Sequence, residues 1–439
     1  MMKSPLFKKA LSTQGISPQQ LIESLHELNH VVFLNNNHMP ILGVLADQYV
    51  CIQSQQIEIH QHQILNHYIA HPTITLLDDF LAFTLLHPNV LTMGFISYDF
   101  AASQHIPIQP KSQPSLFLGH FSHYLSFEND TWFLNSYQSN SDDIFDYINQ
   151  LTAKNTPSHL LLDHACKQRW SKEEYATAFQ HVQDYIVAGD CYQINLTQEF
   201  YAHGQGSLLA TADQFWALTN APYSGYLRIN NFELLSCSPE LFIDFEENKK
   251  MVTKPIKGTM PRYTDPIKDE QSKLTLQNSQ KDQAENVMIV DLLRNDLSVY
   301  AEIGSVKTPK LFNIESFNQV HHMVSEIEAI LKPQIKSIDV LMSALPGGSI
   351  TGAPKIRAIQ IIDELEEAPR GAYCGSMGYF NADGTGSWNI LIRSIQKHQQ
   401  NISIWAGGGI TIASVCESEY QECFDKVSAM LNLLNQHVI

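Results

Sequence analysis

The sequence has few cysteines, few basic residues and no long apolar run. Its seven cysteines are an odd number, and none forms a Cys-x-x-Cys pair, which argues against a zinc ribbon or a disulfide scaffold and fits a reducing compartment. Lysine and arginine number 28 against 45 acidic residues, a net charge of −17, which argues against binding to nucleic acid or to an anionic membrane surface. No run is long enough to cross a bilayer, and residues 1–14 lack the apolar segment of a secretion signal. We therefore expect a cytoplasmic protein.

The chain contains enough hydrophobic residues to form a sizeable core. Hydrophobic residues make up 44% of the 439 positions and charged residues 17%, which is typical of a globular protein with one large or two ordinary domains. Short apolar runs between polar turns predict strands at 31–34, 41–44, 94–98 and 116–118, followed by a short helix at 142–151. The polar stretch 152–159 predicts a boundary between an N-terminal region, 1–150, and a catalytic domain, 165–436.

A lysine beside a glycine lies near the middle of the chain. Strands are predicted at 242–245 and 251–253, and Pro255 stops the second strand just before Lys257 and Gly258. A lysine at a strand end, between an apolar residue and a glycine, is well placed to act as a nucleophile, provided that desolvation or a nearby cation lowers its pKa. On spacing alone a surface lysine in a hairpin is the commoner case, so the interpretation of Lys257 as a nucleophile depends on the other motifs of the chain.

Two predicted helices each carry two acidic residues three positions apart, hence on one face. The pairs are Asp282 with Glu285, in a helix over 281–296, and Glu419 with Glu422, in a helix over 418–434 that Ser418 and Gln421 would cap. The apolar residues expected to be largely buried in the first helix are Val287, Met288, Val290, Leu292 and Leu293. Each pair alone is typical of a solvated face, but the two together offer oxygen ligands for a hard cation such as Mg²⁺.

Glycine-rich segments follow toward the C-terminus. Residues 346–355 look like a phosphate loop, but no Gly-Lys-Ser/Thr follows and Pro354 suits the first turn of a helix instead. The N–H groups at such a helix start suit a carboxylate. Strands are predicted at 370–379, 390–393 and 406–410, and the glycines of the last one let its backbone approach a ligand.

These segments, in this order, resemble the motifs of the chorismate-utilising enzyme family. The matching motifs are Gly-Asp-x-Tyr-Gln-x-Asn-Leu at 189–196, Pro-Ile-Lys-Gly-Thr at 255–259, the two acidic helices and Gly-Ser-x-Thr-Gly-Ala-Pro-Lys at 348–355, within a resemblance that spans 171–434. The resemblance implies an α+β fold of two large antiparallel β-sheets packed face to face, with helices outside and chorismate in a cleft between the sheets.

The resemblance also implies a reaction, the conversion of chorismate and ammonia to 4-amino-4-deoxychorismate for 4-aminobenzoate and folate synthesis. Lys257 would attack C2 of the ring while Glu240 protonates the leaving C4 hydroxyl, and ammonia would then enter at C4 and expel the lysine. Mg²⁺ would be bound directly by Glu285 and Glu422, and through water by Asp282 and Glu419. Substrate-binding residues would be His322, Ser349, Thr351, Tyr373, Arg393, Gly407, Gly408, Gly409 and Lys426.

Two features separate this chain from other branches of the family, and a third is a departure from its relatives in general that affects the expected local packing. Anthranilate synthases usually have alanine in place of Lys257, and isochorismate and salicylate synthases place a water-activating lysine where this chain has Gln193. Relatives usually have small hydroxyl residues where this chain has Trp388-Asn389. Anthranilate synthase component I is the alternative, and a non-catalytic chorismate-binding subunit is a further one. Because the sequence shows no glutaminase signature, we expect ammonia to come from a separate glutamine amidotransferase subunit, component II, in a heterodimer.

Overall fold

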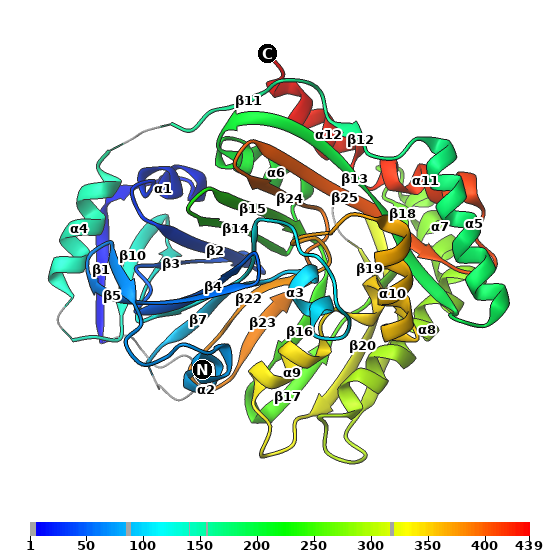
Figure 1. The fold of residues 1–439 in the computed structure, drawn as a ribbon, viewed down its shortest axis with the longest axis horizontal. Helices are drawn as coiled ribbons and strands as arrows, with labels where there is room; N and C mark the ends of the chain where they lie inside the picture. The colour runs from blue at the N-terminus through cyan, green and yellow to red at the C-terminus, as the bar shows by residue number, and fades with distance from the viewer. Residues whose placement is uncertain (1–5, 85–88, 140, 155–156, 317–319) are drawn as a thin grey trace.

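Two large antiparallel sheets dominate the computed structural model, which describes residues 6–84, 89–139, 141–154, 157–316 and 320–439 (Figure 1). Across the described part of the first sheet, which has 13 strands, the order is β1 (Phe7–Gln14), β10 (Thr131–Ser136), β9 (His123–Glu128), β3 (Met39–Val44), β2 (His30–Asn36), β14 (Tyr223–Ile229), β15 (Phe232–Ser238), β24 (Ser394–His398), β25 (Asn401–Ile410), β13 (Gln193–Gly206) and β11 (Leu160–Leu162), with β12 (Lys167–Gln168) and β21 (Gly352–Ala353) also on β13.

The second sheet has 12 strands within the same described ranges. Their order is β18 (Ile256–Pro261), β20 (Val320–Ile330), β17 (Lys250–Thr253), β16 (Leu241–Phe245), β23 (Gly386–Asn389), β22 (Ser376–Phe380), β7 (Leu91–Ile96), β8 (Pro114–Phe121), β4 (Gln48–Gln53), β5 (Gln56–Ile64) and β6 (His67–Ala70), with β19 (Lys307–Ser316) also on β20. The sheets pack face to face: the rings of Phe95, on β7, and Phe232, on β15, stack with centroids 5.4 Å apart. The predicted fold class is therefore confirmed.

Helices surround the sheets and lie toward the outside of the molecule (Figure 1). They are α1 (Pro18–Ser24), α2 (Leu77–Phe83), α3 (Tyr98–Ser103), α4 (Asp142–Thr152), α5 (Lys172–Ala188), α6 (Ala212–Thr219), α7 (Pro266–Gln277), α8 (Gln280–Ser298), α9 (Ser337–Ala344), α10 (Lys355–Glu366), α11 (Cys416–Asp425) and α12 (Ser428–Leu434), with short 3₁₀ turns η1 (Leu208–Thr211), η2 (Glu247–Lys249), η3 (Gly348–Ile350) and η4 (Asn435–His437). In the described ranges, no helix combines the length and the apolar content needed to cross a bilayer.

Local sequence signals set several element ends. Ser171 and Glu174 form a reciprocal capping box at the start of α5, and Gly189 ends that helix in the left-handed conformation with φ of 83°. The strand predicted over 94–98 stops at Ile96 instead, because the Ser97 side chain caps α3 by accepting the N–H of Phe100.

Other predicted helix features are wrong. The helix expected over 418–434 is two helices, α11 and α12, and the first begins at Cys416 after Val415, so Ser418 and Gln421 do not cap it. Pro354 is the residue before α10 rather than part of its first turn. Val287 of α8 is 39% exposed, although its periodicity predicted burial.

The predicted division of the chain does not separate the sheets. Residues 1–150 supply strands to both sheets, and so do the residues after 160. Part of the predicted boundary, residues 155–156, lies outside the described residues. A split into 1–150 and 165–436 stays a prediction.

Candidate active site

Lys257 lies inside a strand, in a β-bulge, and not after a strand end as predicted. The pairing of β18 with β20 is interrupted between Ile256 and Thr259, and Lys257 and Gly258 occupy the interruption. A bulge re-aims the side chains that it carries. Gly258 has φ of +82°, and a Cβ at this position would lie 2.9 Å from the side chain of Asp282. Glycine is therefore what allows α8 to approach the lysine so closely.

A cavity of about 530 Å³ opens between the two sheets beside this bulge. The residues predicted from sequence that line it are Glu240, Lys257, Asp282, Glu285, His322, Ser349, Tyr373, Arg393, Gly407, Gly408, Glu422 and Lys426. The structure thus brings together side chains that are up to about 190 positions apart in the chain.

The amine of Lys257 has no hydrogen-bond or ion-pair partner among the described residues, and the residue lines the cavity. Burial lowers the pKa of Lys257, and the nearby Lys426 lowers it further, while Glu285, Glu240 and Glu422 act in the opposite direction. The net direction favours the neutral amine, which is the form that can act as a nucleophile.

The pKa of Glu240 is shifted in the opposite direction to that of Lys257, upward. Its carboxyl is buried just after β15, and burial raises its pKa to about 7, against the attraction of Lys257 and a hydrogen bond from the N–H of Ile256. A carboxyl that is half protonated near neutral pH can deliver a proton to a leaving group.

Arg393 offers an unpaired cation to the cavity. The segment 390–393 is irregular rather than the predicted strand, and Arg393 has φ of +49°. Its guanidinium makes no hydrogen bond or ion pair with the described residues. Because an arginine stays charged in proteins, this side chain can bind a carboxylate through two parallel hydrogen bonds.

The adjacent histidines of β20 point away from each other, as the strand periodicity predicts. His322 lines the cavity and its Nδ1 lies 2.8 Å from the hydroxyl of Thr259. Burial and the charge of Arg393 lower the pKa of His322 to about 4, so it is neutral near pH 7. His321 instead lies 3.1 Å from a carboxylate oxygen of Asp269.

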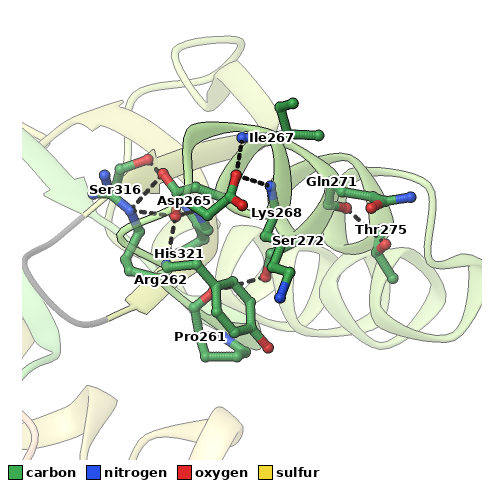
Figure 2. A network of polar contacts seen from close by, with 12 residues as sticks. Pro261, Arg262, Asp265, Ile267, Lys268, Gln271, Ser272, Thr275, Ser316 and His321 are labelled. Atoms are coloured by element: carbon green, nitrogen blue, oxygen red, sulfur yellow. Dashed lines mark hydrogen bonds and ion pairs between the residues drawn. The ribbon is translucent and has the colours of Figure 1, made fainter.

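Asp269 of α7 is the centre of a polar network at the end of β18. Figure 2 shows Arg262, Ser316 and His321 of this network. Its carboxylate accepts the Nε–H of Arg262 at 2.8 and 2.9 Å and the backbone N–H of Tyr263 at 2.9 Å. The other ring nitrogen of His321, Nδ1, lies 2.8 Å from the hydroxyl of Ser316. The contact with Arg262 contributes most to a pKa of about 2 for Asp269. The network fastens α7, β18, β19 and β20 together beside the bulge.

The four acidic residues predicted as metal ligands lie on α8 and α11. Asp282, Glu285 and Glu422 line the cavity, whereas Glu419 is buried and accepts the hydroxyl of Ser414 at 2.7 Å. Burial raises the pKa of Glu419, and the charges of Glu422 and Glu285 add to this. Among the described residues, no three His, Cys, Asp or Glu side chains are grouped as a metal site.

Gly408 shows how close two of these carboxylates lie. A Cβ on Gly408 would be 3.0 Å from a carboxylate oxygen of Glu419 and equally 3.0 Å from one of Glu422. Glu422 also forms an ion pair with Lys426 at 2.6 Å, and Lys426 donates to the carbonyl of Gly407 at 2.7 Å. Gly408, which has no side chain, thus leaves the space that the carboxylates of Glu419 and Glu422 need next to this strand.

Three predicted residues do not belong to the cavity lining. Thr351 is fully buried and its hydroxyl donates to the carbonyl of Gly347 at 2.9 Å. Gly409 is paired with Asn195 in the β-ladder, and Glu419 points toward Ser414 as described above. They support the wall and do not line the cavity.

Several lining residues were missed from the sequence. They are Asn195, Pro239, Ile256, Thr259, Lys281, Ile350, Ile392, Trp405, Ala406, Asp425 and Val427, together with Gly258 of the lysine motif. Most are next to a predicted site residue. Asn195 belongs to the 189–196 motif, where strand alternation with Gln193 could have identified it.

Comparison with known proteins gives one family. The family model described as chorismate binding enzyme matches residues 35–432. Aminodeoxychorismate synthase component 1 of Escherichia coli (strain K12) is 48% identical over 266 residues, 61% of this chain and 58% of the relative. The protein of the same name from Salmonella typhimurium is 46% identical over 286 residues, 65% of this chain and 63% of the relative. The matched region thus covers about three fifths of these relatives.

The fold also matches solved structures. The crystal structure of anthranilate synthase component I from Streptococcus pneumoniae superposes with a TM-score of 0.75 and 24% identity, covering 90% of this chain and 92% of that one. At this identity the likeness concerns the fold alone.

Proposed function

The chain belongs to the chorismate binding enzyme family, and we propose that it converts chorismate and ammonia to 4-amino-4-deoxychorismate. One observation carries the proposal: Lys257 and Glu240 face the same cavity, the pKa of the amine is lowered and that of the carboxyl is raised to about 7. These are the directions that a nucleophile and a general acid need. The relatives named aminodeoxychorismate synthase component 1 support the same reaction.

The two residues would divide the displacement into two steps. The amine of Lys257 forms a bond to C2 as the C4–O bond breaks, and Glu240 gives the proton with which the hydroxyl leaves as water. Ammonia then forms the C4–N bond while the C2–N bond breaks and Lys257 departs as the amine. The surplus proton of the incoming ammonia returns to Glu240, so the chain is restored.

The substrate carboxylates would be bound by the unpaired guanidinium of Arg393 and by the turn that carries Ser349. Both line the cavity, and Ser349 belongs to the 3₁₀ turn η3. A neutral His322 can donate or accept a hydrogen bond beside them without adding charge.

We propose Mg²⁺ as the cofactor, held by Glu285 and Glu422 with Asp282 and Glu419 acting through water. The charges of the cavity fit such an ion: its lining has the basic residues Lys257, Lys281, Arg393 and Lys426 against the acidic residues Glu240, Asp282, Glu285, Glu422 and Asp425. This balance leaves no excess positive charge for a dianionic substrate. When bound, a divalent cation would supply that charge and relieve the mutual repulsion that helps to raise the pKa of Glu419.

Ammonia would come from a glutamine amidotransferase subunit, component II, in a heterodimer, and the product would feed 4-aminobenzoate and folate synthesis in the cytoplasm. The relatives' name, component 1, supports a second component. Cys374, the cysteine nearest to a glutaminase motif, is fully buried and its pKa is raised to about 12, mainly by burial, which makes it a poor nucleophile.

The test is to incubate the purified chain with chorismate, Mg²⁺ and ammonium salt at raised pH and to identify the product by mass. We expect aminodeoxychorismate, and no turnover when glutamine replaces ammonium. Anthranilate with released pyruvate would favour the alternative, anthranilate synthase component I, and no turnover at all would favour a chorismate-binding subunit. Glutamine use by the chain alone would contradict the need for a partner.

A further inference from the structure

A buried ion pair behind the cavity wall has no part in the proposed reaction. Glu366, the last residue of α10, and Arg370 are each 1% exposed. Nη2 of the guanidinium lies 2.7 Å from Oε1 of Glu366, and Nε lies 2.8 Å from Oε2. Because desolvation offsets much of the attraction in a buried pair, such a pair is weak evidence for stability. Its other contacts are more informative.

The same guanidinium holds two backbone carbonyls of the cavity wall. Nη2 donates to the carbonyl of Asn195 at 2.7 Å, and Nη1 donates to that of Ile350 at 3.1 Å. The side-chain amide of Asn195 donates to the same carbonyl of Ile350 at 3.0 Å, and its backbone N–H donates to Thr351 at 2.8 Å. Asn195 and Ile350 both line the cavity. Arg370 therefore joins β13 to the turn that carries Ser349.

Further contacts hold Glu366 and Arg370 on their remaining sides. Oε1 of Glu366 accepts the backbone N–H of Thr197 at 2.9 Å and its hydroxyl at 2.7 Å. The guanidinium lies 4.7 Å from the ring centroid of Tyr98 and 5.9 Å from that of Tyr373, which lines the cavity. The planar fork of an arginine can make these directed bonds at once, whereas the single ammonium of a lysine cannot.

We propose that Arg370 is the positioning residue of the carboxylate-binding wall. It does not line the cavity; it sets the turn at Ser349 against β13 and holds the ring of Tyr373, so that these groups face a carboxylate of chorismate in one fixed arrangement. The identity of this ligand rests on the proposed function. Loss of the guanidinium group of Arg370 is expected to weaken the binding of chorismate without changing the KM for ammonia.

The test compares Arg370→Lys with Arg357→Lys. Arg357 belongs to the same helix as Glu366 but pairs with Asp190 at 3.1 Å on the surface, where its side chain is 33% exposed, so it is a matched control. Chorismate binding is measured by titration calorimetry with Mg²⁺ and without ammonia. We expect Arg370→Lys to raise the Kd by about tenfold or more, and Arg357→Lys to leave it unchanged. Steady-state kinetics should show a raised KM for chorismate and the parent KM for ammonia.

A milder variant covers the case in which Arg370→Lys does not fold. Thr197→Val removes only the hydroxyl bond to Glu366, and we expect a Kd raised by about two- to fivefold with the parent circular dichroism spectrum. A folded Arg370→Lys with the parent Kd and KM overturns the proposal, and so does a lower thermal midpoint with unchanged binding. Parent affinity in Thr197→Val overturns it when Arg370→Lys is insoluble.

The same measurements separate this proposal from the proposed function. If the parent binds chorismate but forms anthranilate, the proposed reaction is wrong, while the Kd values still decide the role of Arg370. If the parent does not bind chorismate, both are overturned.

Discussion

Replacement of Glu240 by glutamine should stabilise the protein above neutral pH while it removes the general acid. The carboxyl has an ordinary pKa of 4.5, and burial raises it to about 7 in the folded chain. The folded state therefore holds the proton more tightly than the unfolded state does. This contribution to stability is complete below pH 4.5 and is lost as pH rises through about 7.

The size of the effect follows from the two pKa values. They differ by about 2.5, and at about 1.36 kcal/mol for each pKa unit the ionised carboxyl costs about 3 kcal/mol. Glutamine has nearly the same shape, keeps an oxygen for the N–H of Ile256 and carries no charge. We therefore expect Glu240→Gln to raise the free energy of unfolding by up to about 3 kcal/mol near pH 8 and by little near pH 5.

Urea unfolding of both proteins between about pH 5 and pH 8 measures this difference, and a shift in midpoint at constant slope reports stability. Glu302→Gln is the control, since Glu302 lies exposed on the surface, and it should change the midpoint little at any pH. An equal gain at both ends of the range would show that burial of the charge is not the cause. No gain near pH 8 would show that the carboxyl is not buried as described.

Three further predictions concern the bulge and the acidic helices. Lys257→Ala should lower kcat by about 1,000-fold or more with the parent circular dichroism spectrum, and mass spectrometry after incubation with chorismate should find an adduct on the parent peptide alone; full activity would exclude the covalent role. Gly258→Ala should destabilise the chain by about 1–3 kcal/mol in urea unfolding, because φ is +82° and the Cβ meets Asp282; parent stability would refute that strain. Glu285→Gln and Glu422→Gln should each raise the Mg²⁺ concentration for half-maximal activity by about tenfold or more, and parent titration curves would mean a solvated helix face.

The fold could be predicted well where local signals decide it. Short apolar runs between polar turns predicted β2, β3 and β8, and the capping box at Ser171 predicted the start of α5, since these patterns act over a few residues. The prediction failed where more than one residue could begin a helix. Val415 rather than Ser418 precedes α11, and that helix ends at Asp425 although the predicted helix continued to 434.

The candidate site was predictable as a set of residues but not as a geometry. The bulge at Lys257 exists because β18 pairs with β20, more than sixty positions later, and no short-range pattern reports such a pairing. Thr351 belongs to a motif with the right spacing, yet its hydroxyl is taken by the carbonyl of Gly347. Which members of a motif face the cavity depends on hydrogen bonds that only the folded chain makes.

The reactivity of the site comes from burial more than from any single partner. Lys257 and Glu240 attract each other as ions, and that attraction opposes both pKa displacements. The ion pair is the form in which neither can start the reaction, since the ammonium has no lone pair and the carboxylate has no proton. Burial is the largest cause for both groups and acts toward the neutral pair. Exclusion of water by a bound ligand adds to this burial, whereas the negative charge of a chorismate dianion by itself raises the pKa of both groups. The close approach of α8 to Gly258, which places Asp282 and Glu285 in the wall of the same cavity, therefore matters for the chemistry as well as for the packing.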